Sequence, residues 1–168
     1  MLNIVLFEPE IPQNTGNIAR TCVGYDATLH MIRPYGFIFN KQNKELVRSG
    51  VDYWDHLKVI EYNSWDDFIK KNQPEQIYFL TRYGKYTPST MKIDKQKETY
   101  IVFGKESTGI DKQILKENVE KTIRIPTSKN VRSLNVSNCV AILAYEYSRQ
   151  NNYDDLEIEE PHKKNILF

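Results

Sequence analysis

Short apolar runs separated by amphipathic stretches make up most of the chain between residues 2 and 150. The runs are rich in β-branched and aromatic residues, and several are apolar at consecutive positions, as in strands buried on both faces. The expected strands are Leu2–Phe7, Thr28–Pro34, Leu57–Tyr62, Gln76–Thr81, Thr99–Gly104 and Lys121–Pro126. This pattern predicts a mainly parallel sheet.

Helical periodicity lies between most of these strands. The expected helices are Thr15–Tyr25, Ser64–Lys71, Thr108–Asn118 and Asn135–Gln150. The second opens with Ser64 and Asp67 at the spacing of a capping box. Strands that alternate with helices predict an α/β fold with a sheet flanked by helices on both faces. The last helix has few polar positions, so it either is central in the monomer or lies in a subunit interface.

Length and composition indicate one globular domain. The chain has 168 residues, of which 40% are hydrophobic, and no repeat or linker-like stretch divides it. We expect a single domain over residues 1–153 and an acidic tail over residues 154–168.

Several function classes are disfavoured. Cys22 and Cys139 stand far apart in apolar helical patterns, so neither a metal pair nor a disulfide framework is indicated. The short apolar N-terminus has no basic flank, and no run approaches the roughly 18 apolar residues of a membrane span. We therefore expect a cytoplasmic protein with no metal and no membrane association. The densest basic run, residues 82–105, is either a phosphate-binding surface or an ordinary solvated face.

Ligands of parallel α/β sheets bind outside the carboxyl ends of the strands, so the loops there are the candidate sites. In the loop after the first strand, Asn14 and Gly16 are expected to allow unusual backbone angles. Asn17 and Arg20 then share one helical face. Such an amide and guanidinium could hold a phosphate or a hydroxyl, or could simply form a solvated first turn.

The loop after the fifth strand contains Gly104 and Gly109 at the spacing of a phosphate loop. Ile110 and Asp111 follow the second glycine, where a P-loop needs Lys and then Ser or Thr, so a P-loop nucleotidase is disfavoured. The missing G-x-G-x-x-G fingerprint also weakens a nicotinamide enzyme. Gly104 would let a ligand approach the backbone. Glu106 offers a carboxylate, which could also merely favour the start of a helix.

A polar segment joins the last strand to the last helix. Ser133 stands where an N-cap could be, and Asn135 and Asn138 share a helical face. A capped core helix would explain Ser133 but not the amides that follow it.

Taken together and in order, three segments resemble the motifs of the SPOUT superfamily of knotted RNA methyltransferases, in its SpoU branch. They are NTGNIAR at residues 14–20, FGKESTG at residues 103–109 and IRIPTSKNVRSLNVSNCVAI at residues 123–142. Within the branch the chain is similar to the single-domain tRNA wobble 2'-O-methyltransferases, the TrmL (YibK-like) family, over nearly all of residues 1–153.

The resemblance implies a fold, a reaction and partners. The fold would carry a C-terminal trefoil knot, although knots are essentially absent among proteins in general. The cofactor would be S-adenosyl-L-methionine, with S-adenosyl-L-homocysteine as product. The substrate would be the anticodon stem-loop of tRNA, methylated on the ribose of the wobble nucleotide, cytidine or modified uridine at position 34. The working form would be a homodimer.

The resemblance also implies the site residues. Arg20 matches the catalytic arginine. The positions that match cofactor-binding residues are Leu80, Gly104, Ile125 and Ser133. Those that match positions at or near the reaction centre are Asn17, Glu106, Arg132, Asn135 and Tyr145. The sequence departs from the family at Thr127, where methionine is usual, and at Cys139, where alanine is common.

Two alternatives stay open. One is a SpoU-type 2'-O-methyltransferase that acts on another tRNA position or on ribosomal RNA, against which the missing accessory domain argues. The other is a non-catalytic RNA-binding module, against which the intact set of site residues argues.

Overall fold

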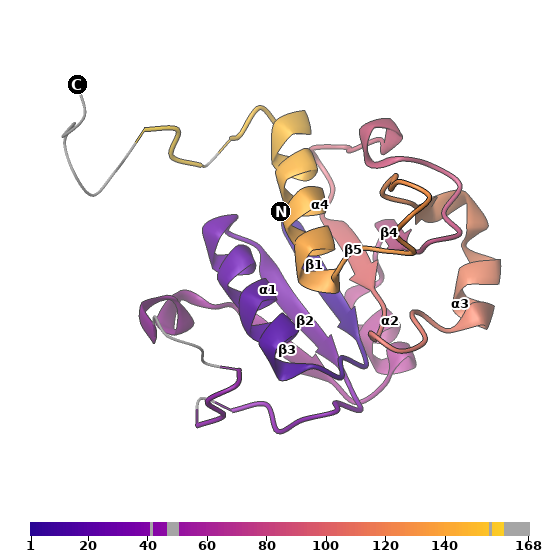
Figure 1. Ribbon diagram of the computed structural model, residues 1–168. Helices are drawn as coiled ribbons and strands as arrows, with labels where there is room; N and C mark the ends of the chain where they lie inside the picture. The colour runs from indigo at the N-terminus through magenta and orange to yellow at the C-terminus, as the bar shows by residue number, and fades with distance from the viewer. Residues whose placement is uncertain (41, 47–50, 155, 160–168) are drawn as a thin grey trace.

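A computed structural model describes residues 1–40, 42–46, 51–154 and 156–159 of the chain (Figure 1). In these residues six parallel strands form one sheet in the order β3-β2-β1-β5-β4-β6. The strands are β1 (Leu2–Phe7), β2 (Thr28–Ile32), β3 (Val59–Tyr62), β4 (Gln76–Leu80), β5 (Thr99–Phe103) and β6 (Thr122–Ile123). The α-helices are α1 (Pro12–Gly24), α2 (Trp65–Asn72), α3 (Lys112–Glu117) and α4 (Val136–Gln150). The predicted α/β class with a mainly parallel sheet is confirmed.

Helices cover both faces of the sheet, and the side chains of β1 alternate between the two resulting cores. Leu2, Ile4 and Leu6 belong to the core beneath α1 and α4, which lie side by side on one face (Figure 1). Val5 and Phe7 point to the opposite core, which α2 and α3 cover. Burial on both faces explains why the central strands are apolar at consecutive positions.

Two helices begin several residues away from the predicted start, because a proline or a polar capping side chain determines their first turn. Helix α1 begins at Pro12, three residues before the predicted start, because proline suits the first helical position. Helix α3 begins only at Lys112, where the Asp111 carboxylate accepts a hydrogen bond from the backbone N–H of Gln113 at 2.7 Å. The predicted N-cap at Ser64 is confirmed by its hydrogen bond from the N–H of Asp67 at 3.2 Å.

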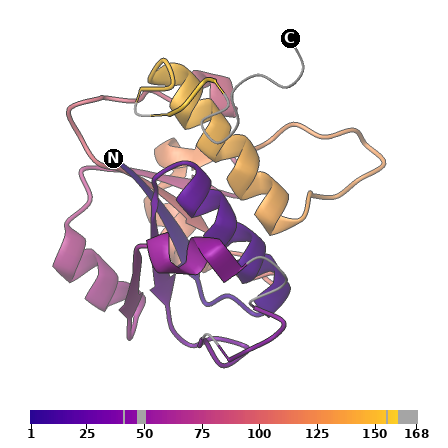
Figure 2. The same ribbon diagram turned by 90° about the vertical axis from the view of Figure 1, so that its left-hand side faces the viewer.

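The start of α4 corrects the role expected for Ser133. The N-cap is Asn135, whose side-chain oxygen accepts hydrogen bonds from the backbone N–H of Ser137 at 2.8 Å and from its hydroxyl at 2.6 Å. An asparagine satisfies the free N–H groups of a first turn as well as a serine does. Ser133 therefore lies in the preceding loop, which projects from the body of the protein (Figure 2).

Strand β6 is held from two sides by the segment that follows β4. The backbone N–H of Thr81 donates to the carbonyl oxygen of Ile123 at 2.9 Å, and the N–H of Arg124 donates to the carbonyl oxygen of Tyr86 at 2.8 Å. Between them, a Cβ on Gly84 would lie 2.2 Å from the carbonyl carbon of Ile123, so only glycine fits there. Residues 81–86 therefore bend tightly around β6. The trefoil knot that the resemblance implies stays a prediction.

A polar residue lies inside the core on the α2 side. His30 is 2% exposed, and its Nδ1 and Nε2 lie 2.8 Å from the hydroxyl of Tyr62 and 2.9 Å from Oδ1 of Asn3. Burial lowers the pKa of His30 to about 4, because the charged ring would lose its hydration. The ring is therefore neutral near pH 7 and serves as a structural hydrogen-bonding group.

Candidate functional site

The three motif loops meet at the carboxyl edge of the sheet through a chain of side-chain hydrogen bonds. The amide nitrogen of Asn14 donates to Oε1 of Glu106 at 2.9 Å. The oxygen of the same amide accepts a hydrogen bond from Nδ2 of Asn135, also at 2.9 Å. The other oxygen of the Glu106 carboxylate accepts from the backbone N–H of Glu10 at 2.9 Å. One residue from each motif therefore joins segments that are far apart in the sequence.

Asn14 is the residue at this site that the sequence reasoning missed. The sequence favours an unusual backbone angle there, but Asn14 lies inside α1, is buried, and is absent from the described residues with positive φ. A buried amide needs partners for both its N–H and its oxygen, and Glu106 and Asn135 provide them. The sequence signal that could have indicated a site role for Asn14 was its amide side chain at the start of the first motif.

A second set of contacts clamps the first motif loop onto the second. The Glu10 carboxylate accepts hydrogen bonds from the backbone N–H of Ser107 at 2.8 Å and from its hydroxyl at 2.7 Å. These bonds favour the charged form and hold the pKa of Glu10 below its ordinary value. Nζ of Lys105 lies 2.5 Å from Oε2 of Glu8, and this hydrogen bond raises the pKa of the lysine. The loop backbones are thus fixed before any ligand binds.

Asn17 and Arg20 are exposed on α1, on the shared face that the sequence predicted. Within the described part of the chain, neither side chain has a hydrogen-bond partner, and Arg20 forms no ion pair. Arg20 lies six residues after Asn14, about 9 Å along the helix axis. A rigid helix tied to the Glu106 chain therefore presents an uncommitted guanidinium to solvent, as an anion-binding site requires.

Leu80, Gly104 and Ile125 come together at the ends of three neighbouring strands. Leu80 pairs with Ile123 in β6, and β5 lies on the other side of β4, so all three residues follow the same sheet edge. Leu80 and Ile125 are half-buried and pack against the α1/α4 core. Neither backbone polar group of Ile125 makes a hydrogen bond with another described residue. Apolar side chains beside free backbone groups fit a flat heteroaromatic ring such as adenine.

The reason for glycine at position 104 differs from the expected one. A Cβ there would lie 2.2 Å from the carbonyl carbon of Gly109 and from the backbone nitrogen of Ile110. Gly109 itself has φ +78°, which favours glycine. The tight turn of the loop therefore already requires Gly104, and its contact with a cofactor stays a prediction.

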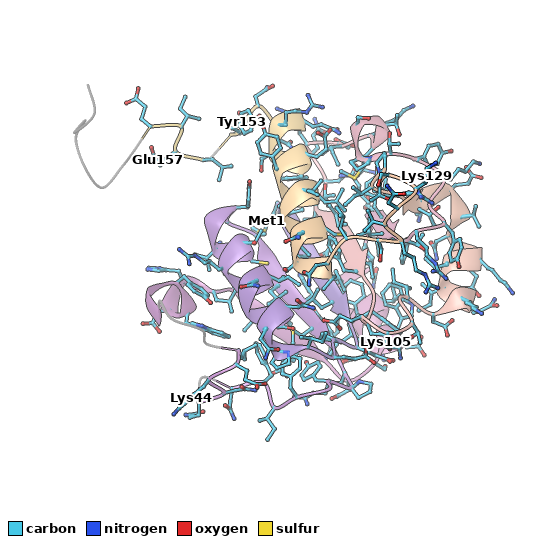
Figure 3. All side chains as sticks on the ribbon, in the orientation of Figure 1. Met1, Lys44, Lys105, Lys129, Tyr153 and Glu157 are labelled. Carbon is cyan, nitrogen blue, oxygen red and sulfur yellow. The ribbon has the colours of Figure 1, made fainter. Side chains whose placement is uncertain are left out.

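The remaining predicted residues are exposed, but only Arg132 and Ser133 lie near this edge. Arg132 and Ser133 lie in the loop before α4, which also carries Lys129 (Figure 3). Tyr145 is 51% exposed and lies ten residues after Asn135 on α4, about 15 Å along the helix axis, so the structure does not bring it to this edge. Its hydroxyl accepts a hydrogen bond at 2.9 Å from that of Tyr153, just beyond the helix.

The basic run over residues 82–105 does not form one phosphate-binding surface. Lys97 and Lys105 flank opposite ends of β5, which is about 16 Å long. Acidic partners from distant parts of the chain also neutralise most of the run. The ion pairs are Lys85–Glu120, Lys95–Asp154, Lys97–Glu75 and Lys105–Glu8. Arg82 and Lys92 are the members without an ion pair in the described part of the chain.

No group of three or more His, Cys, Asp or Glu side chains able to hold a metal ion occurs among the described residues. Within the same residues, no helix is both long and apolar enough to cross a membrane.

This architecture defines an α/β protein whose three motif loops meet at the carboxyl edge of a parallel sheet. Residues 1–145 match the model of the SpoU rRNA Methylase family. The chain belongs to this family and is a methyltransferase.

Relatives of similar length and solved structures agree with this assignment. A protein of Listeria monocytogenes is 46% identical over 99% of this chain and 97% of its own, and one of Geobacillus stearothermophilus is 47% identical over 92% and 98%. Both are named as tRNA (cytidine(34)-2'-O)-methyltransferases. An RNA methyltransferase structure from Bacillus anthracis has a TM-score of 0.86 at 43% identity, covering 95% of this chain and all of that one. A structure described for 2-OH methylation of C/U34 on tRNA has a TM-score of 0.81 at 34% identity, covering 91% and 97%.

Proposed function

We propose that the protein transfers a methyl group from S-adenosyl-L-methionine to the ribose 2'-hydroxyl of nucleotide 34 of tRNA. The observation that carries the proposal is the Glu106–Asn14–Asn135 chain, which ties all three methyltransferase motifs together at one sheet edge. Relatives named for this reaction are 46% and 47% identical to the chain over at least nine-tenths of its length. The target is the wobble cytidine or a modified uridine.

Some residues at the sheet edge bind the cofactor and others bind the RNA. When bound, the cofactor supplies a methyl carbon attached to a positively charged sulfur. Leu80 and Ile125 would hold its adenine with their side chains. The free N–H of Ile125 would donate to a ring nitrogen, its free carbonyl oxygen would accept from the exocyclic amino group, and Gly104 and Ser133 would complete the contact. The fixed loops hold the two reactants in line, which lowers the barrier by positioning.

Arg20 acts on the RNA side. A guanidinium keeps its proton in proteins, so Arg20 is not the base that removes the hydroxyl proton. It binds a phosphate next to the attacking ribose and stabilises the negative charge that develops on the oxygen. Asn17, on the same face of α1, and Arg132, in the projecting loop, orient the nucleotide. The hydroxyl proton passes to an RNA phosphate or to another group, and not to Arg20.

Methylation mapping tests the function directly. Total tRNA from cells with and without the gene should differ by 2'-O-methylation at position 34 in a subset of tRNAs. Purified protein with the cofactor should methylate the same position in tRNA transcripts. Methylation at another tRNA position or in ribosomal RNA would favour the other SpoU-type reaction. RNA binding without methyl transfer would favour a non-catalytic module.

We also propose that residues 1–153 work as one domain and that two copies pair through α4. The support for pairing is an exposed stripe on this helix that includes Ile142, 38% exposed, and Tyr145. The buried free thiols of Cys22 and Cys139 fit the reducing conditions of the cytoplasm.

The pairing has its own test. Ile142→Glu should shift the mass measured by light scattering from dimer to monomer, because the carboxylate would lose its hydration in the interface. Ile60→Glu, on the exposed strand β3, is the matched control and should keep the dimer. A monomeric wild-type protein, or an Ile142→Glu protein that remains dimeric, would contradict pairing through α4.

A further inference from the structure

The loop after β4 presents an aromatic ring to solvent. Tyr83 is 74% exposed, and its ring packs in neither core. The guanidinium carbon of Arg82 lies 4.7 Å from the ring centroid, which is a cation–π contact. A ring that packs in neither core contributes little to folding, and an exposed tyrosine ring offers a partner both an apolar face and a polar tip.

The ring sits on a fixed support. The backbone N–H of Gly84 donates to the carbonyl oxygen of Thr81 at 3.1 Å, which closes a turn around Arg82 and Tyr83. Nη1 of Arg124, the residue that follows β6, donates to the carbonyl oxygen of Arg82 at 2.7 Å. Because Gly84 also packs directly on Ile123, the turn cannot move away from β6 without breaking these contacts. The ring is therefore presented with little loss of freedom on binding.

The two arginines beside the ring have donors left for phosphates, although Nη1 of Arg124 already donates to the carbonyl oxygen of Arg82. Neither Arg82 nor Arg124 forms an ion pair within the part of the chain that the structure describes. This distinguishes them from the nearby Lys85, whose Nζ lies 2.5 Å from Glu120. A fixed aromatic face next to unpaired cations suits unpaired RNA, whose bases stack on the ring while its phosphates meet the cations.

The surface formed by Tyr83, Arg82 and Arg124 lies next to the proposed cofactor site. Tyr83 follows Leu80 by three residues, and Arg124 directly precedes Ile125, so both flank the proposed adenine site. We propose that Tyr83 is a stacking platform for one unpaired nucleotide of the anticodon loop close to nucleotide 34, with Arg82 and Arg124 on its phosphates. This inference rests on the proposed function and adds a residue that positions the RNA.

Binding of an anticodon stem-loop RNA tests the platform. Tyr83→Ala should weaken binding roughly tenfold or more, because stacking of one base on an aromatic ring contributes that much. Tyr83→Phe, which keeps the ring, should bind within about twofold of wild type. Ile60→Ala removes an exposed apolar side chain on β3 and should change nothing. Cofactor affinity, measured by calorimetry, should be the same in all these proteins.

A set of RNAs with one abasic nucleotide each makes the test specific. The ratio of Tyr83→Ala to wild-type affinity should return to about one for a single RNA, the one that lacks the stacked base. Equal affinity of Tyr83→Ala and wild type for the intact RNA would overturn the inference. A constant ratio across all abasic RNAs would overturn it too, since the loss would not come from one base. If wild-type protein binds the stem-loop but methylates no RNA, the proposed function fails while the platform is still judged by the ratios.

Discussion

Replacement of Arg20 by alanine should lower methyl transfer to tRNA by at least about 100-fold, the loss typical when one donor to a developing oxyanion is removed. Cofactor affinity and thermal stability should stay unchanged, because the side chain is exposed and makes no hydrogen bond or ion pair with a described residue. The measurement is single-turnover methylation with saturating cofactor, together with calorimetric titration of the cofactor.

Two further variants test whether the planar guanidinium of Arg20 is required or whether any positive charge is enough. Arg20→Lys keeps the charge but loses the planar fork, so it should recover only part of the rate. Arg33→Ala removes another exposed arginine, one that pairs with Glu61 at 2.6 Å, and should leave the rate near wild type. An Arg20→Ala enzyme that binds cofactor and methylates at a near-normal rate would show that the alkoxide is stabilised by another group.

Strand positions could be predicted from the sequence because burial on both faces leaves a local signature. The predicted bounds of β1 are those that the structure gives it, and β2, β4 and β5 start at the predicted residues. Helix starts were less predictable, since a cap depends on which polar side chain reaches the first free N–H groups. At α4 both Ser133 and Asn135 were available, and spacing alone does not choose between them.

In the candidate site, too, one part could be predicted from the sequence and another could not. That the three loops meet follows from a parallel sheet, where strands end at one edge. The partners within the site do not follow, because they depend on contacts between residues about a hundred positions apart, such as Asn14 with Glu106. The sequence could not decide between the two interpretations of the basic run for the same reason: the acids that pair with it, among them Glu75 and Asp154, come from elsewhere in the chain.

The Glu106–Asn14–Asn135 chain offers a sharper test of how the site is held together. Glu106→Gln replaces one acceptor oxygen by an N–H donor. Because both partners of this carboxylate are donors, the new N–H group must face either the amide nitrogen of Asn14 or the backbone N–H of Glu10. Asn14→Asp instead sets a second carboxylate against Glu106. Each single variant should lose about 1–3 kcal/mol of folding free energy, the cost of an unsatisfied or repelled polar group. Methyl transfer should fall about tenfold or more as the loops shift.

The double variant, Glu106→Gln with Asn14→Asp, should recover both properties. The new amide at position 106 would donate to the new carboxylate at position 14 and still accept from the N–H of Glu10. That carboxylate would still accept from Nδ2 of Asn135. The direction of one hydrogen bond is reversed and the net charge is kept. Urea unfolding and single-turnover rates, combined as a double-mutant cycle, measure the coupling.

The two readouts of this cycle separate a positioning role for Glu106 from a catalytic one. If stability returns but methyl transfer does not, the carboxylate is needed at position 106 itself and Glu106 acts on the reactants. If both return, its role is to hold the first and third motifs in the positions from which Arg20 and the cofactor site face the same ribose.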